Sequence, residues 1–408
     1  MQPTQPSKSI SYSLSQSFAP VVVTPTPVVI SEQPSAATSL IARVLHLVNG
    51  EHFSGAERVQ SHLGRCLPDY DTVADFACVK PGKFAELIDE QRGNWGVCHR
   101  VPMSSRFDLR AAWAVRQLVR DHEYHLLHAH TPRTAMIAAL ASRIAGVPWV
   151  YHVHSPAARD SERWLSNRFN AAIERASRYG CSHLITVSNS LRQDCLARGA
   201  RPDRVTVVRN GVPTVRPDRM HTPTVGGGWT LGMIALMRPR KGLEVLLQAL
   251  AKLRGKFDLT LRIIGPFETD SYEDSINQII VELGIEAMIE RVGFTQDVSG
   301  ELAKLDAMVL PSLFGEGLPM VVLEAMAAAV PVIASRVEGT PEAVTDGVEG
   351  LLAQPNDPDS LAAKIRELVS GEVDWHTMSE AAASRHARDF SDVAMAERTA
   401  AVYRSILA

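Results

Sequence analysis

The sequence predicts an α/β protein made of two doubly wound, parallel-sheet domains that face each other across a cleft. In both halves of the 408-residue chain, short apolar runs alternate with amphipathic helical stretches, the pattern of β-α-β units in a parallel sheet. A segment at 210–228, with prolines and a Gly-Gly-Gly end, interrupts this alternation, as an interdomain linker would. Ligands of open α/β sheets bind outside the carboxyl ends of the strands, so two facing sheets would share one site.

The N-terminal half predicts one domain over 40–215, preceded by a disordered tail. Residues 1–39 are rich in Ser, Thr, Pro and Gln, a composition that cannot bury a core. Helical periodicity is clearest in Ala56–Leu67 and Thr134–Ala145. The apolar runs that predict strands are Val44–Val48, Phe76–Val79, His125–Ala129, Trp149–Val153, Leu184–Val187 and Val205–Val208.

The C-terminal half predicts a second domain over 216–390. Its first helix, from about Gly242, carries five leucines at helical spacing: Leu243, Leu246, Leu247, Leu250 and Leu253. Residues 391–408 are expected to form a last helix that packs back on the N-terminal domain. The apolar runs that predict strands are Leu231–Leu236, Leu259–Ile264, Ala307–Leu310 and Val332–Ala334.

Composition excludes several classes of protein. The formal net charge is −3, which argues against nucleic-acid binding. The five cysteines are dispersed without a C-x-x-C pair, which argues against a disulfide framework or a zinc site and indicates a reducing cytosol. Because the chain also lacks an apolar run of about 18 residues, we expect a cytoplasmic protein without a transmembrane helix.

The sharpest chemical pattern lies in the C-terminal half. A strand is expected to end near Leu310 and to be followed by a glycine loop at 314–318. Pro319 is expected at the first position of a helix that runs to about Ala329. Free N–H groups and the positive dipole end at such a helix start suit a diphosphate. Carboxylates on either side of it are good acceptors for the hydroxyls of a sugar and a ribose.

These residues resemble glycosyltransferase family 4. Glu316 and Glu324 have the E-x7-E spacing, within Pro-Ser…Glu-Gly-x-Pro…Leu-Glu-Ala-Met-Ala…Pro-Val-Ile-Ala. The likeness continues through 338–342 and 346–350 and covers the chain from about residue 43. One departure is Ala329, where the family commonly has glycine, a change we expect to affect helix–strand packing. The resemblance implies a GT-B fold of two Rossmann-like domains, retaining transfer from a nucleotide-diphosphate sugar, and no metal or other cofactor.

The same resemblance assigns roles around the glycine loop. It implies that Glu316 acts on the donor sugar as a catalytic residue and that Glu324 binds the ribose. Backbone amides of Gly317, Leu318 and Met320 would approach the sugar and the diphosphate.

A cationic motif, Met-Arg-Pro-Arg-Lys-Gly, follows the first strand of the C-terminal half. Cations there would neutralise a diphosphate leaving group. The family usually has its arginine earlier in this motif, so we expect Lys241 and then Arg238 to be catalytic, with Arg240 as a further donor-binding residue. The resemblance places the base near 291–294, with Phe294 as its contact.

A glycine-containing loop follows the first strand of the N-terminal half. Gly50 and Gly55 bound it just before a helix, which suits the close approach of a ligand. The loop resembles the family's Gly-Gly-Ala-Glu loop, so we expect Gly55 to reach the donor phosphate and Gly50 the acceptor. It lacks the Gly-Lys-Ser/Thr of nucleotide triphosphatases.

Two pairs of histidines end neighbouring strands of the same half, His128 with His130 and His152 with His154. Imidazoles are common metal ligands, but we expect no metal site, because alternating strand residues point to opposite faces. The resemblance instead places His130 at the reaction centre, in contact with sugar and acceptor, and His154 along the acceptor side of the cleft.

The segment 157–179 carries five arginines together with Trp164, Phe169 and Tyr179. A basic, aromatic helix of this kind binds an anionic membrane surface; alternatively it is a surface helix packed on its own domain. The first interpretation predicts a peripheral protein on the inner face of the membrane.

Together these patterns predict a glycosyltransferase that moves a sugar to a hydroxyl of a glycan or lipid-linked acceptor in polysaccharide or glycoconjugate synthesis. Three alternatives remain: another GT-B activity, such as a nucleotide-sugar epimerase or a phosphorylase; a protein that binds the donor without turnover; and a dinucleotide oxidoreductase. The last is disfavoured because no G-x-G-x-x-G follows the first strand.

Overall fold

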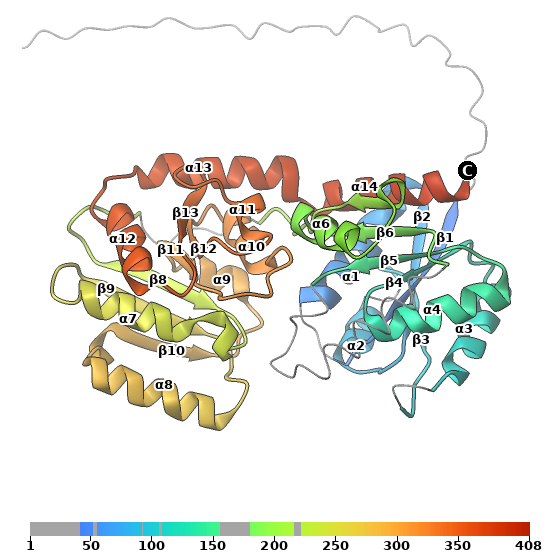
Figure 1. Cartoon of the computed structure of the whole chain (residues 1–408), viewed down its shortest axis with the longest axis horizontal. Coiled ribbons are helices and arrows are strands. Elements are labelled where there is room, and N and C mark those ends of the chain that lie inside the picture. The colour runs from blue at the N-terminus through green and yellow to red at the C-terminus, as the bar shows by residue number, and fades with distance from the viewer. Residues whose placement is uncertain (1–40, 52–54, 92, 106–107, 156–179, 216–221) are drawn as a thin grey trace, which may run out of the picture. The chain divides into compact units, whose positions relative to one another are not determined.

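Two parallel β-sheets organise the chain in the computed structural model, which describes residues 41–51, 55–91, 93–105, 108–155, 180–215 and 222–408 (Figure 1). The tail expected at 1–39 and the basic segment expected at 157–179 lie outside the described residues. From Leu40 onward the contacts form one compact unit. The prediction of an α/β fold with two doubly wound sheets is confirmed.

The first sheet has the strand order β3-β2-β1-β4-β5-β6-β7 in the described chain. All of its neighbouring strands pair in parallel. The strands are β1 Ala42–Val48, β2 Thr72–Cys78, β3 Cys98–Arg100, β4 Leu126–Ala129, β5 Trp149–Val153, β6 His183–Thr186 and β7 Val205–Val207. The helices around it are α1 Gly55–Cys66, α2 Lys83–Glu90, α3 Arg110–Asp121, α4 Pro132–Ala145 and α6 Asn189–Ala197, with short 3-10 turns η1 Leu67–Tyr70 and η2 Pro202–Arg204.

The second sheet has the order β10-β9-β8-β11-β12-β13, again parallel throughout. Its strands are β8 Trp229–Ile234, β9 Leu259–Ile264, β10 Ile289–Gly293, β11 Ala307–Leu310, β12 Val332–Ser335 and β13 Gly350–Ala353. Its helices are α7 Leu243–Leu253, α8 Asp270–Leu283, α9 Val298–Leu302, α10 Met320–Ala327, α11 Thr340–Ala343, α12 Pro358–Val369 and α13 Trp375–Arg385. Short turns η3 Pro239–Lys241 and η4 Glu286–Met288 and a π-helical turn η5 His386–Phe390 complete it.

Strand order places a crossover in each sheet. The chain reverses direction across the sheet between β1 and β4 in the first sheet, and between β8 and β11 in the second. Open α/β sheets bind ligands at such switch points, beyond the carboxyl ends of the strands. The loops after these four strands are therefore where the fold favours a site.

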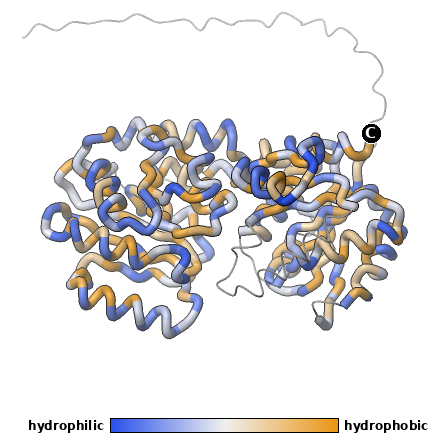
Figure 2. Tube along the Cα trace, viewed as in Figure 1, coloured by the Kyte–Doolittle hydropathy of each residue, from blue (hydrophilic) through white to orange (hydrophobic). Residues whose placement is uncertain are grey.

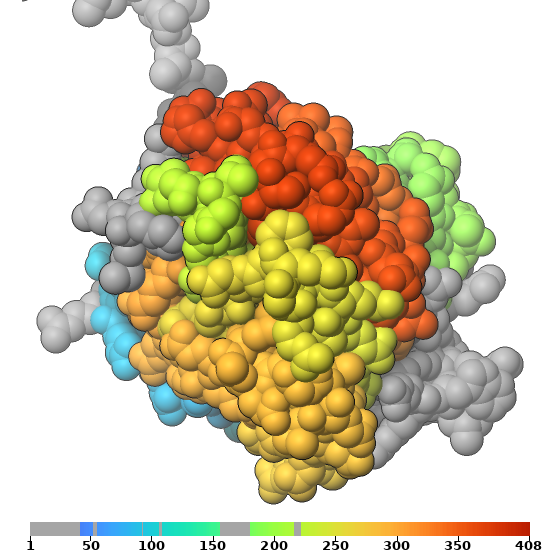
Figure 3. Space-filling model, turned by 90° about the vertical axis from the view of Figure 1, so that its left-hand side faces the viewer, coloured from blue at the N-terminus to red at the C-terminus, as the bar shows by residue number. Residues whose placement is uncertain are grey.

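Helix α7 shows why the leucine stripe folds as it does. Its five leucines are all buried, from 0 to 4% exposed, and they pack with strand residues such as Leu231 and Ile263 in one core cluster. The predicted stripe is confirmed. Figure 2 shows hydrophobic and hydrophilic residues alternating along the outer helices. Figure 3 shows the yellow α7 region between the gold α8 region and the red C-terminal helices, in agreement with the contacts of α7 with α8 and α12.

The last helix, α14 Asp392–Leu407, packs on α1 of the first domain. Arg65 of α1 forms an ion pair with Asp392, and Tyr403 is fully buried in the core cluster that contains the strands of the first sheet. The C-terminal residues therefore complete a domain that begins more than 300 residues earlier in the chain. Within the described ranges, no helix combines the length and apolar character that crossing a bilayer requires.

Several boundaries differ from those expected from the sequence. Strands β3, β10 and β13 were not predicted, because β3 has three residues and β10 carries exposed charges at a sheet edge. Pro319 is the N-cap of α10 rather than its first residue, and the helix ends at Ala327 rather than Ala329. Ala329 has φ +56°, a left-handed conformation that glycine adopts without strain. A backbone requirement, and not helix–strand packing, thus explains why glycine suits this position.

Candidate active site

The predicted catalytic glutamate lies in the loop after β11, at the switch point of the second sheet. Glu316 is 5% exposed, and its Oε1 atom accepts a hydrogen bond from Lys241 Nζ at 2.5 Å and from Ser312 Oγ at 2.6 Å. Burial raises the pKa of Glu316, but Lys241, Ser312 and Arg240 together outweigh it and lower the pKa below its ordinary value. The site therefore holds an ionised carboxylate beside two cations.

The structure brings Arg240, rather than Arg238, to this carboxylate. Arg240 Nη1 lies 3.8 Å from Glu316 Oε1, whereas Arg238 Nη2 lies 3.7 Å from Glu268 Oε1. Arg240 and Lys241 both belong to the short turn η3, Pro239–Lys241, whereas Arg238 precedes that turn as its N-cap. Of the two arginines, Arg240 therefore shares the immediate surroundings of Lys241 and Glu316.

Helix α10 starts directly after the glycine loop. Its N–H groups at Val322 and Leu323 bond to Pro319 O, so the N–H groups of Met320 and Val321 are those that a first helical turn leaves for a ligand. Helix N-termini of this kind attract phosphate groups.

The second predicted glutamate is held from the other domain. Glu324 is 9% exposed and forms an ion pair with Arg58 of α1. Burial raises the pKa of Glu324, and the Arg58 charge opposes that rise without cancelling it. The E-x7-E pair is thus divided: Glu316 faces cations of its own domain, and Glu324 faces a cation of the first domain.

The glycine loop packs tightly against the first domain. A Cβ atom on Gly317 would lie 2.1 Å from His154 O, and one on Gly339 would lie 1.7 Å from Gly317 O. A Cβ atom on Gly55 would lie 3.5 Å from Met320 Cγ. The residues predicted to bind donor and acceptor therefore come together, because loops of the two domains touch here.

Leu318 lies in the same contact. It is 3% exposed, and its carbonyl accepts a hydrogen bond from Asn210 Nδ2 at 3.0 Å. Gly50, on the first domain, has φ +84°, and a Cβ atom there would lie 2.8 Å from Cys78 Sγ. Glycine is required at this turn for backbone conformation and space.

The histidines gather on one side of the first sheet, and the expectation that each pair splits between two faces is wrong. Residues two apart in a strand point to the same face, so His128 and His130 stack at 4.1 Å and His152 and His154 at 4.2 Å between ring centroids. His46 of β1 joins them, 5.1 Å from the His130 ring. Burial first, and neighbouring histidines second, lower the pKa of His130 well below 6.5.

The metal-binding potential of these rings follows from the same geometry. Two groups, His46 with His128 and His130, and His130 with His152 and His154, each have ligand nitrogens within 4.8 Å of one another. Neutral imidazoles suit Zn²⁺ or Cu²⁺, yet His130 already contacts two other imidazole nitrogens at 3.0 and 3.1 Å.

Phe294, the predicted base contact, follows β10 and is 66% exposed. Its ring lies 5.7 Å from Lys83 Nζ of α2, which is a cation–π distance. An exposed aromatic ring beside the first domain is available for stacking.

Three contact residues were missed by the sequence reasoning. Ser312 bonds to Glu316, Arg58 pairs with Glu324, and Glu338 accepts the Glu316 backbone N–H at 2.5 Å. Glu338 has φ +43°, an uncommon conformation for a residue with a side chain. Glu338 lies in the segment 338–342 that resembles the family, but the spacing assigned it no contact. Both Arg58 and Glu338 act across loops that meet only in the folded chain.

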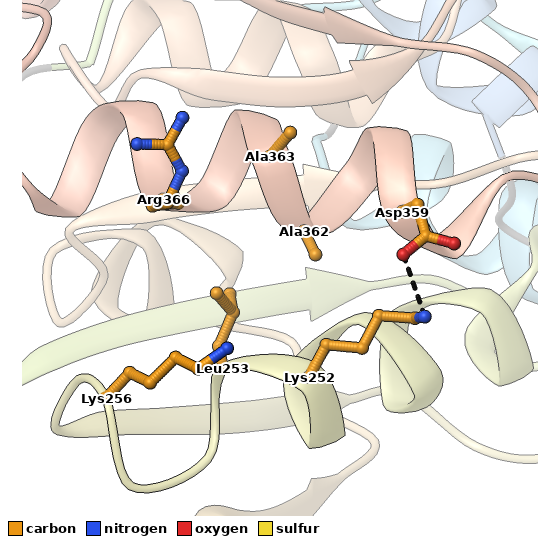
Figure 4. Close-up of a pocket in the computed structure, with 7 residues that line it drawn as sticks. All are labelled: Lys252, Leu253, Lys256, Asp359, Ala362, Ala363 and Arg366. Carbon is orange, nitrogen blue, oxygen red and sulfur yellow. Dashed lines mark ion pairs between the residues drawn. The ribbon is translucent and has the colours of Figure 1, made fainter.

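A hollow between α7 and α12 lies apart from these residues (Figure 4). Lys252 Nζ pairs with Asp359 Oδ1 there at 2.8 Å. Its lining residues are Lys252, Leu253, Lys256, Asp359, Ala362, Ala363 and Arg366. None of them was predicted as a site residue.

Comparison with known protein families matches both halves of the chain. Residues 53–216 match the family described as Glycosyltransferase Family 4, and residues 229–371 match Glycosyl transferases group 1. The chain is 30% identical over 310 residues to alpha-maltose-1-phosphate synthase of Mycolicibacterium smegmatis, covering 69% of this chain and 79% of that protein. It is 22% identical over 348 residues to the Escherichia coli UDP-Gal:alpha-D-GlcNAc-diphosphoundecaprenol alpha-1,3-galactosyltransferase, covering 81% and 89%.

Solved structures share the fold. Anabaena HepE in complex with UDP superposes with a TM-score of 0.77 at 23% identity, covering 89% of this chain and 100% of that one. The sucrose-phosphate synthase of Thermosynechococcus elongatus gives a TM-score of 0.75 at 17% identity, covering 90% and 99%. The predicted GT-B fold of two Rossmann-like domains is confirmed.

Proposed function

This chain belongs to glycosyltransferase family 4, and from that premise we propose that it transfers a sugar from a nucleotide-diphosphate donor to a hydroxyl acceptor with retention at the anomeric carbon. That it is a glycosyltransferase using a nucleotide sugar follows from the family. Retention, the acceptor and the part played by each residue are the proposal. The observation that carries it is the pair of cations, Lys241 and Arg240, on one buried carboxylate beside the start of α10.

The donor diphosphate is proposed to bind between these cations and the N-terminal turn of α10. Lys241 and Arg240 carry two positive charges against the single negative charge of Glu316, so this trio attracts an anion. As the bond to the sugar breaks, charge builds on the diphosphate, and preorganised cations and N–H groups stabilise it. Arg238, which pairs with Glu268, is proposed to support the same charge from further away.

Glu316 is proposed to contact the donor sugar, and Glu324 to bind the ribose. Glu316 has a lowered pKa, so it is an ionised acceptor for sugar hydroxyls at neutral pH. Gly55 and Gly317, with Leu318 and Met320, form the close-packed loops along which the diphosphate would lie. Phe294 is proposed to contact the base.

The acceptor is proposed to enter from the first domain, along Gly50, His130 and His154. The His154 carbonyl lies against Gly317, so a hydroxyl bound there would be near the donor sugar. We propose that the acceptor hydroxyl attacks the anomeric carbon on the same face from which the diphosphate departs. The departing diphosphate accepts the proton of that hydroxyl. That route needs no metal to stabilise the leaving group, because Lys241, Arg240 and the helix start carry that role.

The acceptor class is proposed to be a glycan or a lipid-linked saccharide. The E. coli relative's name describes a diphosphoundecaprenol-linked substrate, and a Salmonella relative is named for colanic acid biosynthesis. Transfer of a sugar to such a lipid-linked acceptor would place the protein at the inner surface of a membrane. Flotation with anionic and neutral vesicles tests this part; absence of salt-sensitive binding to either would refute it.

The decisive experiment has two stages. A thermal-shift screen of nucleoside diphosphates and their sugars identifies the donor, since ligands of the folded state raise its melting temperature. Transfer is then measured with EDTA present, and the anomeric configuration of the first product is read by proton NMR. Glu316→Ala and Lys241→Ala are expected to lower kcat by roughly 10²–10³-fold, and Lys241→Ala also to weaken donor binding.

The matched control is Lys252→Ala, which removes a lysine paired with Asp359 in the hollow away from the site. It is expected to behave as the unmodified protein. Wild-type rates in both Glu316 and Lys241 variants would refute the site, an inverted product would refute retention, and loss of activity with EDTA would refute metal independence.

A further inference from the structure

Four buried side chains and the partly buried His154 form a continuous hydrogen-bonded chain that includes Tyr403 of the C-terminal helix and reaches the predicted reaction centre. His128 Nδ1 lies 2.5 Å from Tyr403 Oη, and Tyr403 Oη lies 3.3 Å from His46 Nε2. His46 Nδ1 lies 3.0 Å from His130 Nε2, and His130 Nδ1 lies 3.1 Å from His154 Nε2. Each internal ring is used through both of its nitrogens.

The two ends of this chain are defined by the same rings. Among the described residues, none provides a hydrogen-bond partner for His128 Nε2 or for His154 Nδ1. His128 Nε2 ends the chain inside the first domain, where His128 is fully buried. At the other end, the backbone carbonyl of His154 lies against Gly317 of the glycine loop. That loop is the one predicted to bind the donor.

Each ring in the chain is neutral. Burial lowers the pKa of His46 to about 3 and that of His154 to about 4, and lowers those of His128 and His130 well below 6.5. A neutral imidazole has one N–H donor and one acceptor nitrogen. Every link must therefore have one donor and one acceptor, and the Tyr403 hydroxyl must donate to one of its two histidines. Fixing the proton on one ring then fixes it on all the others.

Only two arrangements satisfy this rule. In the first, all four histidines carry the proton on Nδ1, Tyr403 donates to His46, and His154 Nδ1 ends the chain as a donor. In the second, all four carry it on Nε2, Tyr403 donates to His128, and His154 Nδ1 ends the chain as an acceptor. Any mixture either leaves two donors or two acceptors facing each other at some link, or leaves the Tyr403 hydroxyl hydrogen without an acceptor in the chain. In a buried site either defect costs the full unsatisfied-group penalty.

We propose that Tyr403 and His46 are positioning residues that set, through His130, whether His154 presents a donor or an acceptor to the bound substrates. The inference deepens the proposed function, and its kinetic test, the effect of Tyr403→Phe on kcat, rests on that function. A His154 donor suits a diphosphate or sugar oxygen, and an acceptor suits a hydroxyl. Because the chain switches as a unit, a residue on α14 controls the reaction centre without touching a substrate.

A bound metal is the competing account of the cluster. It would use the same nitrogens as ligands, and His130 belongs to both candidate triads. The observed contacts favour the hydrogen-bonded chain, because 3.0 and 3.1 Å are hydrogen-bond distances. The cluster also contains no carboxylate in either triad, although a buried divalent cation would need its charge offset.

The first test uses the unmodified protein and needs no activity. Ring-¹⁵N histidine NMR distinguishes Nδ1–H from Nε2–H forms, and single His→Gln variants assign the signals. His46, His128, His130 and His154 are expected to be neutral at pH 7 and to share one form. Mixed forms among the four, or one equivalent of a transition metal in protein purified without chelator, would overturn the proposal.

The second test removes the link at α14. Tyr403→Phe keeps the ring and deletes only the hydroxyl, and it is expected to change the proton positions of His130 and His154 and to lower kcat about tenfold, with donor KM within about twofold of wild type. The matched control is Tyr124→Phe, because Tyr124 is a buried tyrosine of the same domain whose hydroxyl bonds to Asp75 at 2.7 Å and to His99 Nε2 at 3.0 Å. Neither partner belongs to the chain of four histidines.

The two variants separate a positioning role from a structural one. Tyr124→Phe is expected to leave the four histidine signals and kcat unchanged. Equal kcat and equal spectra in the two variants would overturn the role of Tyr403. If Tyr403→Phe does not fold, the spectrum of the unmodified protein still decides. A uniform proton form in a protein that shows no transferase activity would refute the proposed function alone.

Discussion

Lowering the pH from 7.5 to 5.5 is expected to reduce the free energy of unfolding by at least about 5 kcal/mol, because four almost fully buried histidines alone must stay neutral in the folded chain. Burial holds the pKa of each below 6.5, to about 3 for His46 and well below 6.5 for His128, His130 and His152. In the unfolded chain these rings titrate near 6.5. As the pH falls, the unfolded state therefore binds protons that the folded state does not, and it becomes more stable relative to the folded one.

The size of the effect follows from the number of rings. A histidine that titrates only in the unfolded chain contributes about 1.4 kcal/mol between pH 7.5 and 5.5. Four such rings are 0 to 3% exposed, so they contribute about 5 kcal/mol, a large share of the roughly 5–15 kcal/mol that stabilises a domain. This stability is fully present above pH 7 and is lost as the pH falls through 6.5.

Urea unfolding followed by circular dichroism at a series of pH values measures the change. His152→Leu is the informative variant, because neither of its ring nitrogens has a hydrogen-bond partner among the described residues. It is expected to reduce the pH-dependent loss by about 1.4 kcal/mol. His376→Gln, at a side chain 73% exposed, is the control and should leave the loss unchanged. A total loss below about 2 kcal/mol would refute the reasoning.

Three further outcomes are expected. Gly317→Ala should lower the rate of transfer more than tenfold and cost about 1–3 kcal/mol of stability, because its Cβ atom would meet the His154 backbone carbonyl. Activity assays and urea unfolding measure the two effects, and near-wild-type transfer would contradict the packing argument. Ala329→Gly should raise the free energy of unfolding by about 1 kcal/mol by relieving its φ of +56°, whereas Ala328→Gly, at φ −82°, should lower it. Arg58→Ala should cost about 3 kcal/mol by leaving Glu324 buried without its cation, and adding Glu324→Gln should recover part of that loss; equal stability of the single and double variants would argue against the pair.

The sequence predicts most of the fold because the relevant signals are local. Apolar runs and the α7 leucine stripe identify buried strands and a helix face without knowledge of the partner element. Strands β3 and β10 were missed because their three and five residues include exposed charged side chains and carry no clear periodicity. Strand β13, four buried residues that begin with a glycine, was also missed. The left-handed conformation at Ala329 was also missed, because alanine in a sequence does not indicate a positive φ as glycine does.

In the candidate site too, residues with a local sequence signal were predicted, and residues that meet only in the folded chain were missed. Glu316, Lys241 and Gly317 lie in loops directly after strands, where the fold concentrates ligand contacts, and their spacing is visible in the chain. Arg58 could not be found, because it meets Glu324 only when two domains come together. The histidines were seen but misassigned to opposite faces, although a separation of two residues places them on one face.

Helix α14 has a consequence for how the protein is made. The chain emerges from the ribosome from its N-terminus, so the first sheet is complete long before Tyr403 is synthesised, and the whole second domain follows in between. Until α14 docks, His46 and His128 lack the hydroxyl that joins them, and a buried surface of the first domain stays open. Assembly of the reaction centre must therefore wait for the last helix, so a nascent chain cannot acquire activity domain by domain.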